Sequence, residues 1–240
     1  MPKIYEVGGC VRDRILGVDC KDIDFTFVLD DKNQSVESGF MSMDLWLRKN
    51  GYTVYNSTPR CFTIKAKFPK GHKHEGLTAD FVMARKEIGY YEGTRRPILE
   101  LGTLEDDLIR RDFTLNAMAL DEDENLIDLF DGVKDLKMGI LRTPRPCQLT
   151  FDEDPLRILR CERFCITKGF RMTDDIEVAI KNYDYESKMQ VVSNERIQDE
   201  LTKCFKFDTL KTILMLNEFP ELRDYVFNHT KMWLKPSFQK

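Results

Sequence analysis

The sequence predicts an α+β fold, in which an N-terminal head with a mixed sheet and helices precedes an all-helical region. Residues 1–90 alternate short runs rich in β-branched and aromatic side chains with runs whose apolar residues recur at helical spacing. From residue 151 onward, helical spacing continues with few interruptions. We therefore expect three regions: a head over 1–140, a helical neck over 141–205 and a short helical body over 206–240.

The elements of the head follow from local patterns. Val11, Ile15 and Leu16 recur at helical spacing, which predicts a short helix. Residues 22–29 alternate polar and apolar side chains before becoming hydrophobic, which is typical of a strand. A mixed sheet with helices on one side follows. The expected elements are a helix over 10–16, a strand over 22–29, a helix over 38–50 and strands over 61–68 and 77–84.

The second half is predicted to be helical. Thr103 and Asp106 have the spacing of a capping box, which predicts that a helix begins there. An arginine-rich run over 110–116 is interpreted as helical. Further helices are expected over 153–167, 174–182, 194–205 and 209–218.

Composition narrows the class of protein. The chain has 240 residues, of which 42% are hydrophobic and 32% charged, as is usual for globular proteins. The formal net charge of −4 lacks the bulk positive charge typical of nucleic-acid binders, which argues mildly against a nucleic-acid partner. No stretch approaches 18 apolar residues, so we expect no membrane partner. The seven scattered cysteines predict free thiols and a cytoplasmic location.

Two aspartates on one strand are the sharpest local feature. Period-two alternation puts Asp22 and Asp24 on the same face, with Ile23 directed to the core. Paired carboxylates repel one another unless a cation lies between them, and their hard oxygens suit Mg²⁺. A D-x-D motif alone is also typical of a solvated surface strand. Asp80 is a candidate third acid, and the alternative of a simple turn residue stays open.

A glycine pair supports the functional interpretation. Gly8 and Gly9 precede a helix, so their backbone can approach phosphate oxygens, and Arg12 can reach the same anion. A phosphate cradle near a carboxylate pair is what nucleotidyl transfer requires.

Two arginine-rich segments add candidate nucleotide contacts. Arg111, Asp112 and Asn116 combine a phosphate-binding group with groups that can hold a ribose hydroxyl. A second set lies three residues apart along one helix, and its alternative interpretation is a solvated face with weak ion pairs. An Asp/Arg pair in this set can recognise a base edge, because the carboxylate accepts and the guanidinium donates. The set is Asp154, Arg157, Arg160 and Arg163.

Together these motifs make the chain resemble the class II tRNA nucleotidyltransferase (CCA-adding enzyme) and bacterial poly(A) polymerase family, within the DNA polymerase β-like superfamily. The matching segments appear in the family's order. They are Gly-Gly-Cys-Val-Arg-Asp at 8–13 with Leu-Gly at 16–17, Asp-Ile-Asp at 22–24, the arginine-rich run at 110–117, Asp-Leu-Phe-Asp-Gly-Val-Lys-Asp-Leu at 128–136, Glu-Asp-Pro-Leu-Arg-Ile-Leu-Arg with its continuation at 153–164, and the Glu-Arg-Ile segment at 195–201.

The resemblance implies the fold and the roles of individual residues. The head would be a polymerase β-like nucleotidyltransferase domain, with Asp22, Asp24 and Asp80 as catalytic carboxylates and the first two of them as ligands of two Mg²⁺ ions. Asp154 and Arg157 would select CTP or ATP by Watson–Crick-like hydrogen bonds. The other nucleotide-binding residues would be Gly8, Gly9, Arg12, Arg111, Asp112, Asn116, Arg160 and Arg163. The segment 86–97 would correspond to the loop associated with the switch from C to A addition.

The reaction implied is addition or repair of the 3′-terminal CCA of tRNA from CTP and ATP, with release of pyrophosphate. Alternatives are partial addition of CC or A, poly(A) synthesis, or a catalytically silent RNA-binding module. Two departures from the family stand out, which are Val133 at a usual glycine and a short region after the Glu-Arg-Ile segment. We therefore expect a tRNA grip that is weak, confined to the 3′ acceptor end or supplied by a second subunit, so a dimer is one expectation.

Overall fold

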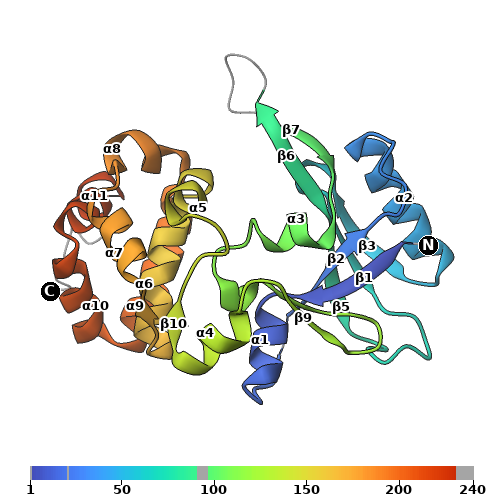
Figure 1. The fold of residues 1–240 in the computed structure, drawn as a ribbon, viewed down its shortest axis with the longest axis horizontal. Helices are drawn as coiled ribbons and strands as arrows, with labels where there is room; N and C mark the ends of the chain where they lie inside the picture. The colour runs from blue at the N-terminus through green and yellow to red at the C-terminus, as the bar shows by residue number, and fades with distance from the viewer. Residues whose placement is uncertain (1, 21, 91–96, 231–240) are drawn as a thin grey trace, which may run out of the picture. The chain divides into compact units, whose positions relative to one another are not determined.

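The computed structural model describes residues 2–20, 22–90 and 97–230, and these divide into two compact units (Figure 1). Unit 1 comprises Met1–Val133 and unit 2 comprises Lys134–Lys240. Within the described residues, no helix is both long and apolar enough to cross a membrane.

A seven-stranded mixed sheet forms the centre of unit 1. The strand order is β3-β4-β5-β2-β1-β8-β9, and β2 and β5 are its one parallel pair among the described strands. The strands are β1 (Lys3–Val7), β2 (Ile23–Val28), β3 (Thr53–Thr58), β4 (Thr63–Lys67), β5 (Thr78–Met83), β8 (Met118–Leu120) and β9 (Leu126–Asp128). The predicted strands over 22–29, 61–68 and 77–84 are β2, β4 and β5, whereas β1, β3, β8 and β9 were not predicted.

Strands β6 (Arg85–Tyr90) and β7 (Pro97–Leu101) form a separate antiparallel hairpin. The loop that the resemblance associates with nucleotide switching runs over 86–97. Its tip, with Tyr91, Gly93, Arg95 and Arg96, lies outside the described residues.

Strand β2 separates the two faces of the sheet. Phe25 and Phe27 are buried on one face, where Phe27 packs against Trp46 of helix α2 (Val36–Lys49) at 5.4 Å between ring centroids. Asp24 and Thr26 point to the opposite face, where Thr26 Oγ1 donates to Asp107 of helix α3 (Leu104–Leu108). The expectation of helices on one side of the sheet is therefore wrong, because both faces of β2 carry a helix.

Helix α2 follows from its sequence. The Ser35 hydroxyl accepts a hydrogen bond from the Ser38 amide and caps the helix. Its buried residues recur at helical spacing and meet the sheet in a core with almost no solvent exposure. The least exposed members of this core are Phe27, Met43, Leu47, Ile64, Ala66 and Phe81.

The capping box that opens α3 is confirmed. The Thr103 hydroxyl accepts from the Asp106 amide at 3.1 Å, and the Asp106 carboxylate accepts from the Thr103 amide at 2.8 Å. The expected helix over 110–116 is wrong, since only a 3₁₀ turn forms at Thr114–Asn116. Asp112 explains this difference, because its carboxylate accepts from the Phe113 amide and so competes with helical hydrogen bonding.

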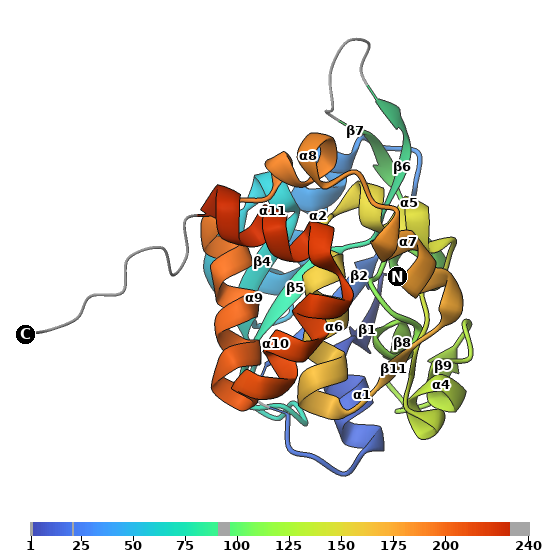
Figure 2. The same cartoon turned by 90° about the vertical axis from the view of Figure 1, so that its left-hand side faces the viewer.

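Unit 2 is largely helical, and Figure 2 shows α9 and α10 beside α6, while α11 packs against α9 and α10. A two-residue parallel pair, β10 (Ile140–Leu141) with β11 (Arg171–Met172), is the exception to the all-helical prediction. The helices are α4 (Gly132–Met138, at the border between the units), α5 (Cys147–Glu153), α6 (Leu156–Lys168), α7 (Asp174–Lys181), α8 (Tyr185–Lys188), α9 (Asn194–Phe207), α10 (Thr209–Glu218) and α11 (Pro220–Thr230). The short helix α1 (Gly9–Ile15) of unit 1 completes the set.

The helix expected over 153–167 is broken at its start. Helix α5 ends at Glu153, and Asp154 has an extended backbone before α6 begins at Leu156. Pro155 is the cause, because a residue that precedes proline is forced out of the helical region. The break places Asp154 just before the N-terminal end of α6 instead of within a helix.

The cysteine expectation is partly wrong. Cys10 and Cys20 form a disulfide in unit 1, and their Cα atoms are 5.3 Å apart. The other five are free, and all of these except Cys61 are buried.

Glu162 is an unusual buried group in α6. Its side chain is 2% exposed, and its Oε1 has no hydrogen-bond partner among the described residues. Burial raises the pKa of Glu162 to about 8, and the neighbouring Cys165 and Glu218 act in the same direction. Glu162 is therefore protonated in the folded state at neutral pH.

We predict that alkylation of the unfolded chain without reductant labels five cysteines, and that alkylation after reduction labels seven. Peptide mass spectrometry identifies the two protected positions as Cys10 and Cys20. Seven labels before reduction would show that this pair is reduced in solution.

We predict that Glu162→Gln stabilises the protein more at pH 7.5 than at pH 5. The folded-state pKa is about 8 and the ordinary value is 4.5, so between these values the native state holds a proton that the unfolded state has lost. Wild-type stability therefore falls with rising pH, by about 1.4 kcal/mol per pH unit from this group. Urea unfolding at both pH values measures the difference, with Glu37→Gln, at an exposed position of α2, as control. An equal effect of Glu162→Gln at the two pH values would contradict the raised pKa.

Candidate active site

Three aspartates of unit 1 gather where β2 and β5 run side by side. Asp24 and Asp80 are direct partners in the parallel register of these strands. Asp22 is exposed and lies just before β2. Ile23 is 8% exposed and belongs to the core, as the alternation predicts. Asp80 is therefore a strand residue beside Asp24, so the alternative that it is a turn residue is wrong.

The electrostatics of Asp24 reflect this convergence. Burial raises the pKa of Asp24, and the Asp80 and Asp22 carboxylates raise it further, whereas the Arg111 guanidinium lowers it. The Lys65 ammonium lies 4.0 Å from Asp80 and is half-exposed. A net excess of negative charge therefore meets at one edge of the β2–β5 pair, and a cation is the group that would relieve it.

The donor set fits a hard cation that shares its coordination with a substrate. Among the residues that the structure describes, no three His, Cys, Asp or Glu side chains are arranged to enclose a metal ion by themselves. Mg²⁺ is usually held by one or two carboxylates together with waters and phosphate oxygens, so two or three carboxylates along one strand edge suit it.

Gly8 lies close to an arginine of the same unit. Its φ of +79° is accessible to glycine, and its amide donates to the Met118 carbonyl. A Cβ built on Gly8 would lie 2.8 Å from Nη1 of Arg111. Glycine is therefore required here so that the guanidinium can approach the backbone.

Asp107 holds that guanidinium. Its Oδ2 accepts from Arg111 Nη2 at 2.9 Å and from Thr26 Oγ1 at 2.7 Å, and its Oδ1 accepts from Arg110 Nη2 at 2.6 Å. Burial raises the pKa of Asp107, but the charges of Arg111 and Arg110 outweigh this and keep the pKa well below its ordinary value. Asp107 thus stays ionised although it is buried.

Arg12, Asn116 and Asp112 form a second buried network. Arg12 Nη1 donates to Asn116 Oδ1 at 2.7 Å, and Asn116 Nδ2 donates to Asp112 Oδ1 at 2.9 Å. Arg12 also pairs with Asp13, and its guanidinium lies 3.5 Å from the position of a Cβ on Gly9. The structure brings these predicted residues together below the glycine pair, where they are at most 8% exposed.

The predicted base-selecting residues of unit 2 lie at the N-terminal end of α6. Asp154 accepts from Arg196 Nη2 at 2.9 Å, and its other oxygen accepts from the Leu156 amide. Arg157 Nη1 donates to Glu153 at 2.7 Å and to the Thr150 carbonyl. Asp154 and Arg157 are therefore each fixed by other groups and do not pair with each other through their side chains.

The remaining arginines of α6 are partly buried. Arg163 pairs with Glu200 of α9 and lies over the Phe164 ring at 4.8 Å. Arg160 is half-buried on the same helix. The alternative of a solvated charged face is thus wrong for Arg157 and Arg163, whose side chains are 13% and 18% exposed.

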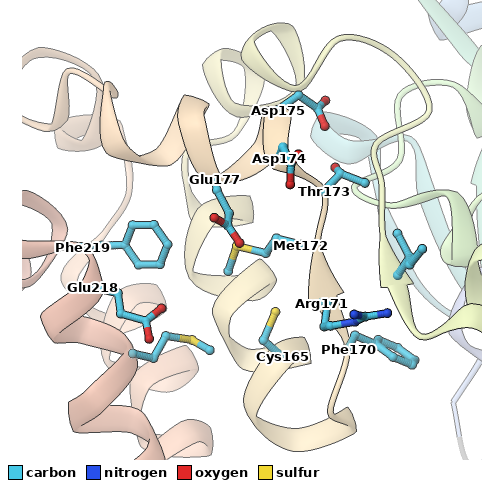
Figure 3. Close-up of a pocket in the computed structure, with 12 residues that line it drawn as sticks. Cys165, Phe170, Arg171, Met172, Thr173, Asp174, Asp175, Glu177, Glu218 and Phe219 are labelled. Carbon is cyan, nitrogen blue, oxygen red and sulfur yellow. The ribbon is translucent and has the colours of Figure 1, made fainter.

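A cavity of about 660 Å³ lies elsewhere in unit 2. Figure 3 shows Met172, Glu177 and Phe219 among its lining residues, which come from β11, α7 and the end of α10. None of the predicted site residues lines it.

Sequence reasoning missed the residues that hold the predicted ones in place. Asp107 was not singled out, although its spacing from Arg110 and Arg111 is that of helical i,i+3 and i,i+4 ion pairs. Glu153 precedes Arg157 by four residues and was detectable in the same way. Thr26 carried no such signal, because its partner lies 81 residues away along the chain.

Sequence comparison finds one matching family and several similar proteins. The poly A polymerase head domain family matches residues 4–142. The mitochondrial CCA tRNA nucleotidyltransferase of Saccharomyces cerevisiae is 34% identical over 236 residues, covering 92% of this chain and 41% of that protein. The CCA-adding enzyme of Buchnera aphidicola subsp. Schizaphis graminum is 34% identical over 234 residues, covering 92% of this chain and 51% of the relative.

Solved structures of similar proteins share the fold of this chain. A CCA-adding enzyme in complex with CTP has a TM-score of 0.71 at 29% identity, covering 95% of this chain and 48% of the other. A tRNA nucleotidyltransferase with a primer tRNA and an incoming ATP analogue has a TM-score of 0.68 at 29% identity, covering 94% of this chain and 59% of the other. The chain spans about half the length of the curated relatives that it matches. The α+β fold expected for the head is thereby confirmed, and the chain belongs to the poly A polymerase head domain family, in the branch that includes the class II CCA-adding enzymes.

Proposed function

We propose that this protein is a template-independent RNA nucleotidyltransferase that adds or repairs the 3′-terminal CCA of tRNA from CTP and ATP. In this reaction the tRNA 3′-hydroxyl attacks the α-phosphate in line and pyrophosphate leaves. The observation that carries the proposal is the register pair Asp24 and Asp80 on a strand face that also has Arg111 as a neighbouring cation. Nucleotidyl transfer brings a metal ion and a triphosphate together. Carboxylates that can hold the metal, beside an arginine that can bind the phosphates, suit this reaction.

We assign the catalytic carboxylates to Asp22, Asp24 and Asp80, with Asp22 and Asp24 as the residues that would hold two Mg²⁺ ions. Bound Mg²⁺ supplies activation of the hydroxyl and neutralises charge on the pyrophosphate. The chain itself contributes position, since the parallel register keeps Asp24 and Asp80 side by side. The presence of these acids also disfavours a catalytically silent RNA-binding module.

The remaining head residues would bind the nucleotide. Arg111 beside Gly8 offers a guanidinium to the triphosphate, and the Arg12 guanidinium lies near Gly9. Asp112 and Asn116 would hold the ribose, and their mutual hydrogen bond fixes the orientation of the amide.

In unit 2, Asp154 and Arg157 would select the base. A carboxylate that accepts and a guanidinium that donates can distinguish the Watson–Crick edges of cytosine and adenine. Arg196 and Glu153 preorganise these two side chains before a nucleotide arrives. Arg160 and Arg163 would add positive charge for the phosphates along the same helix.

The names of similar proteins support the assignment. Relatives are named CCA-adding enzymes, and neighbouring structures hold CTP, or a primer tRNA with an ATP analogue. We propose CTP, ATP and the tRNA acceptor end as this chain's own partners. A cytoplasmic location stays a prediction, as does a dimer, and one relative is mitochondrial by name.

We predict that the protein extends a tRNA lacking its CCA by three nucleotides and then stops. tRNAs ending at positions 73, 74 or 75 are incubated with CTP, ATP or both in Mg²⁺, and the products are resolved at single-nucleotide length. Asp24→Asn is expected to lower the rate by at least about 10³-fold, because the metal loses a charged ligand. The control is Asp44→Asn, which removes an α2 ion pair with Arg48 outside the proposed site.

The other outcomes of this assay are equally specific. Products that stop after CC or after a single A would indicate partial addition, and long A tails would indicate a poly(A) polymerase. No extension by the wild-type protein would contradict the proposed enzyme activity.

We predict that Gly8→Ala weakens nucleotide addition about tenfold or more, because the new methyl group displaces the Arg111 guanidinium. The matched control is Gly17→Ala, since Gly17 also has a positive φ but a Cβ there meets nothing within 4 Å. Both variants also lose stability, because each places a Cβ on a backbone with positive φ. Comparable rates for the two variants at a temperature where both are folded would contradict the role of the Gly8–Arg111 contact.

A further inference from the structure

We propose that Asp107 is a positioning residue, which fixes the guanidinium of Arg111 so that its remaining N–H groups face the nucleotide phosphates. This inference rests on the proposed function, because it names a residue that acts through Arg111 in the same reaction. Asp107 itself is fully buried and makes no contact with substrate in this proposal.

The carboxylate joins three elements of unit 1. Asp107 lies on α3, Arg110 and Arg111 lie just beyond the end of that helix, and Thr26 lies on β2. Thr26 donates to the same oxygen of Asp107 that accepts from Arg111. Thr26 is also two residues from Asp24 on the same face of the strand, so Asp107 links the arginine to the strand that carries a catalytic carboxylate.

The carboxylate and the guanidinium groups of this cluster differ in their exposure to solvent. One carboxylate serves two guanidinium groups, so Asp107, Arg110 and Arg111 together carry a net positive charge. The arginine side chains are 22% and 21% exposed, whereas that of Asp107 is 1% exposed. The negative group is thus hidden and the positive groups keep an accessible part.

Arg111 has unused donors at the place where a phosphate is expected. Its Nη2 donates to Asp107 at 2.9 Å and to Thr26 Oγ1 at 3.4 Å, and its buried Nε has no hydrogen-bond partner among the described residues. Nη1 faces the Gly8 backbone, where a Cβ would come within 2.8 Å. A buried Nε without a partner indicates that this guanidinium is incompletely satisfied without a ligand.

A structural pair elsewhere in unit 1 shows the contrast. Arg14 Nη2 donates to both oxygens of Glu6, and Arg14 Nη1 lies 3.5 Å from Glu124. The buried Glu6 carboxylate thus accepts hydrogen bonds from one arginine, and that arginine also forms an ion pair with Glu124. Glu6 therefore offers a matched control for loss of a buried carboxylate.

The test is a double-mutant cycle on CTP affinity, measured by calorimetry with the full chain in Mg²⁺. Asp107→Asn is expected to weaken CTP binding about tenfold, because Arg111 loses its anchor, and the KM for CTP should rise more than kcat falls. In an Arg111→Ala background, Asp107→Asn should weaken binding no further. Glu6→Gln should leave CTP affinity unchanged while lowering the unfolding midpoint.

Thr26→Val is a milder variant that guards against misfolding of Asp107→Asn. It keeps the size of the side chain but removes the hydrogen bond that Thr26 donates to Asp107 at 2.7 Å and the longer one, at 3.4 Å, that it accepts from Arg111. CTP binding should therefore weaken severalfold, and this effect should disappear in the Arg111→Ala background. Wild-type affinity in Asp107→Asn or Thr26→Val, or an effect that adds fully to that of Arg111→Ala, would overturn the positioning role while leaving the proposed function intact. A wild-type protein that neither binds CTP nor extends tRNA would overturn both.

Discussion

The two-faced character of strand β2 is the constraint on which unit 1 depends. Its alternate residues enter the core against α2, and the residues between them carry the acid and hydroxyl groups of the candidate site. A shift of one residue in its pairing would put Asp24 in the core and Phe25 in the site. Because β2 pairs with β1 on one side and β5 on the other, the same register aligns Asp24 with Asp80. One hydrogen-bonding register therefore decides both which β2 residues pack in the core and which carboxylates lie side by side in the candidate site.

Buried carboxylates have opposite roles in the two units. Asp107 is surrounded by guanidinium groups, which hold its pKa low and keep it charged, so it can anchor Arg111. Glu162 lacks such partners, and burial raises its pKa to about 8, so it is neutral in the folded chain at neutral pH. The comparison shows that burial alone does not decide ionisation, since the nearest charges decide whether the desolvation cost is offset. Only the first arrangement supplies a fixed charge to a site.

Local rules predicted elements wherever a short motif was sufficient. The Thr103 capping box, the D-x-D strand and the helices over 174–182 and 209–218 were recognised from spacing and end signals. The continuous helix from 153 failed at Pro155, where a pre-proline rule visible in the sequence should have taken precedence over hydrophobic periodicity. The short strands β8 and β9 were not predicted, because three residues carry too little periodicity to be recognised.

Residue types and their spacing were enough to predict the candidate site residues and the two faces of strand β2. They could not determine which distant groups would meet. Arg12 bonds with Asn116 across 104 residues and Thr26 bonds with Asp107 across 81, and these contacts depend on strand order and on where the helices cross the sheet. The disulfide between Cys10 and Cys20 likewise needs the chain to turn back before β2. Side-chain hydrogen bonds act over about 3 Å, so only the tertiary structure decides which pairs form.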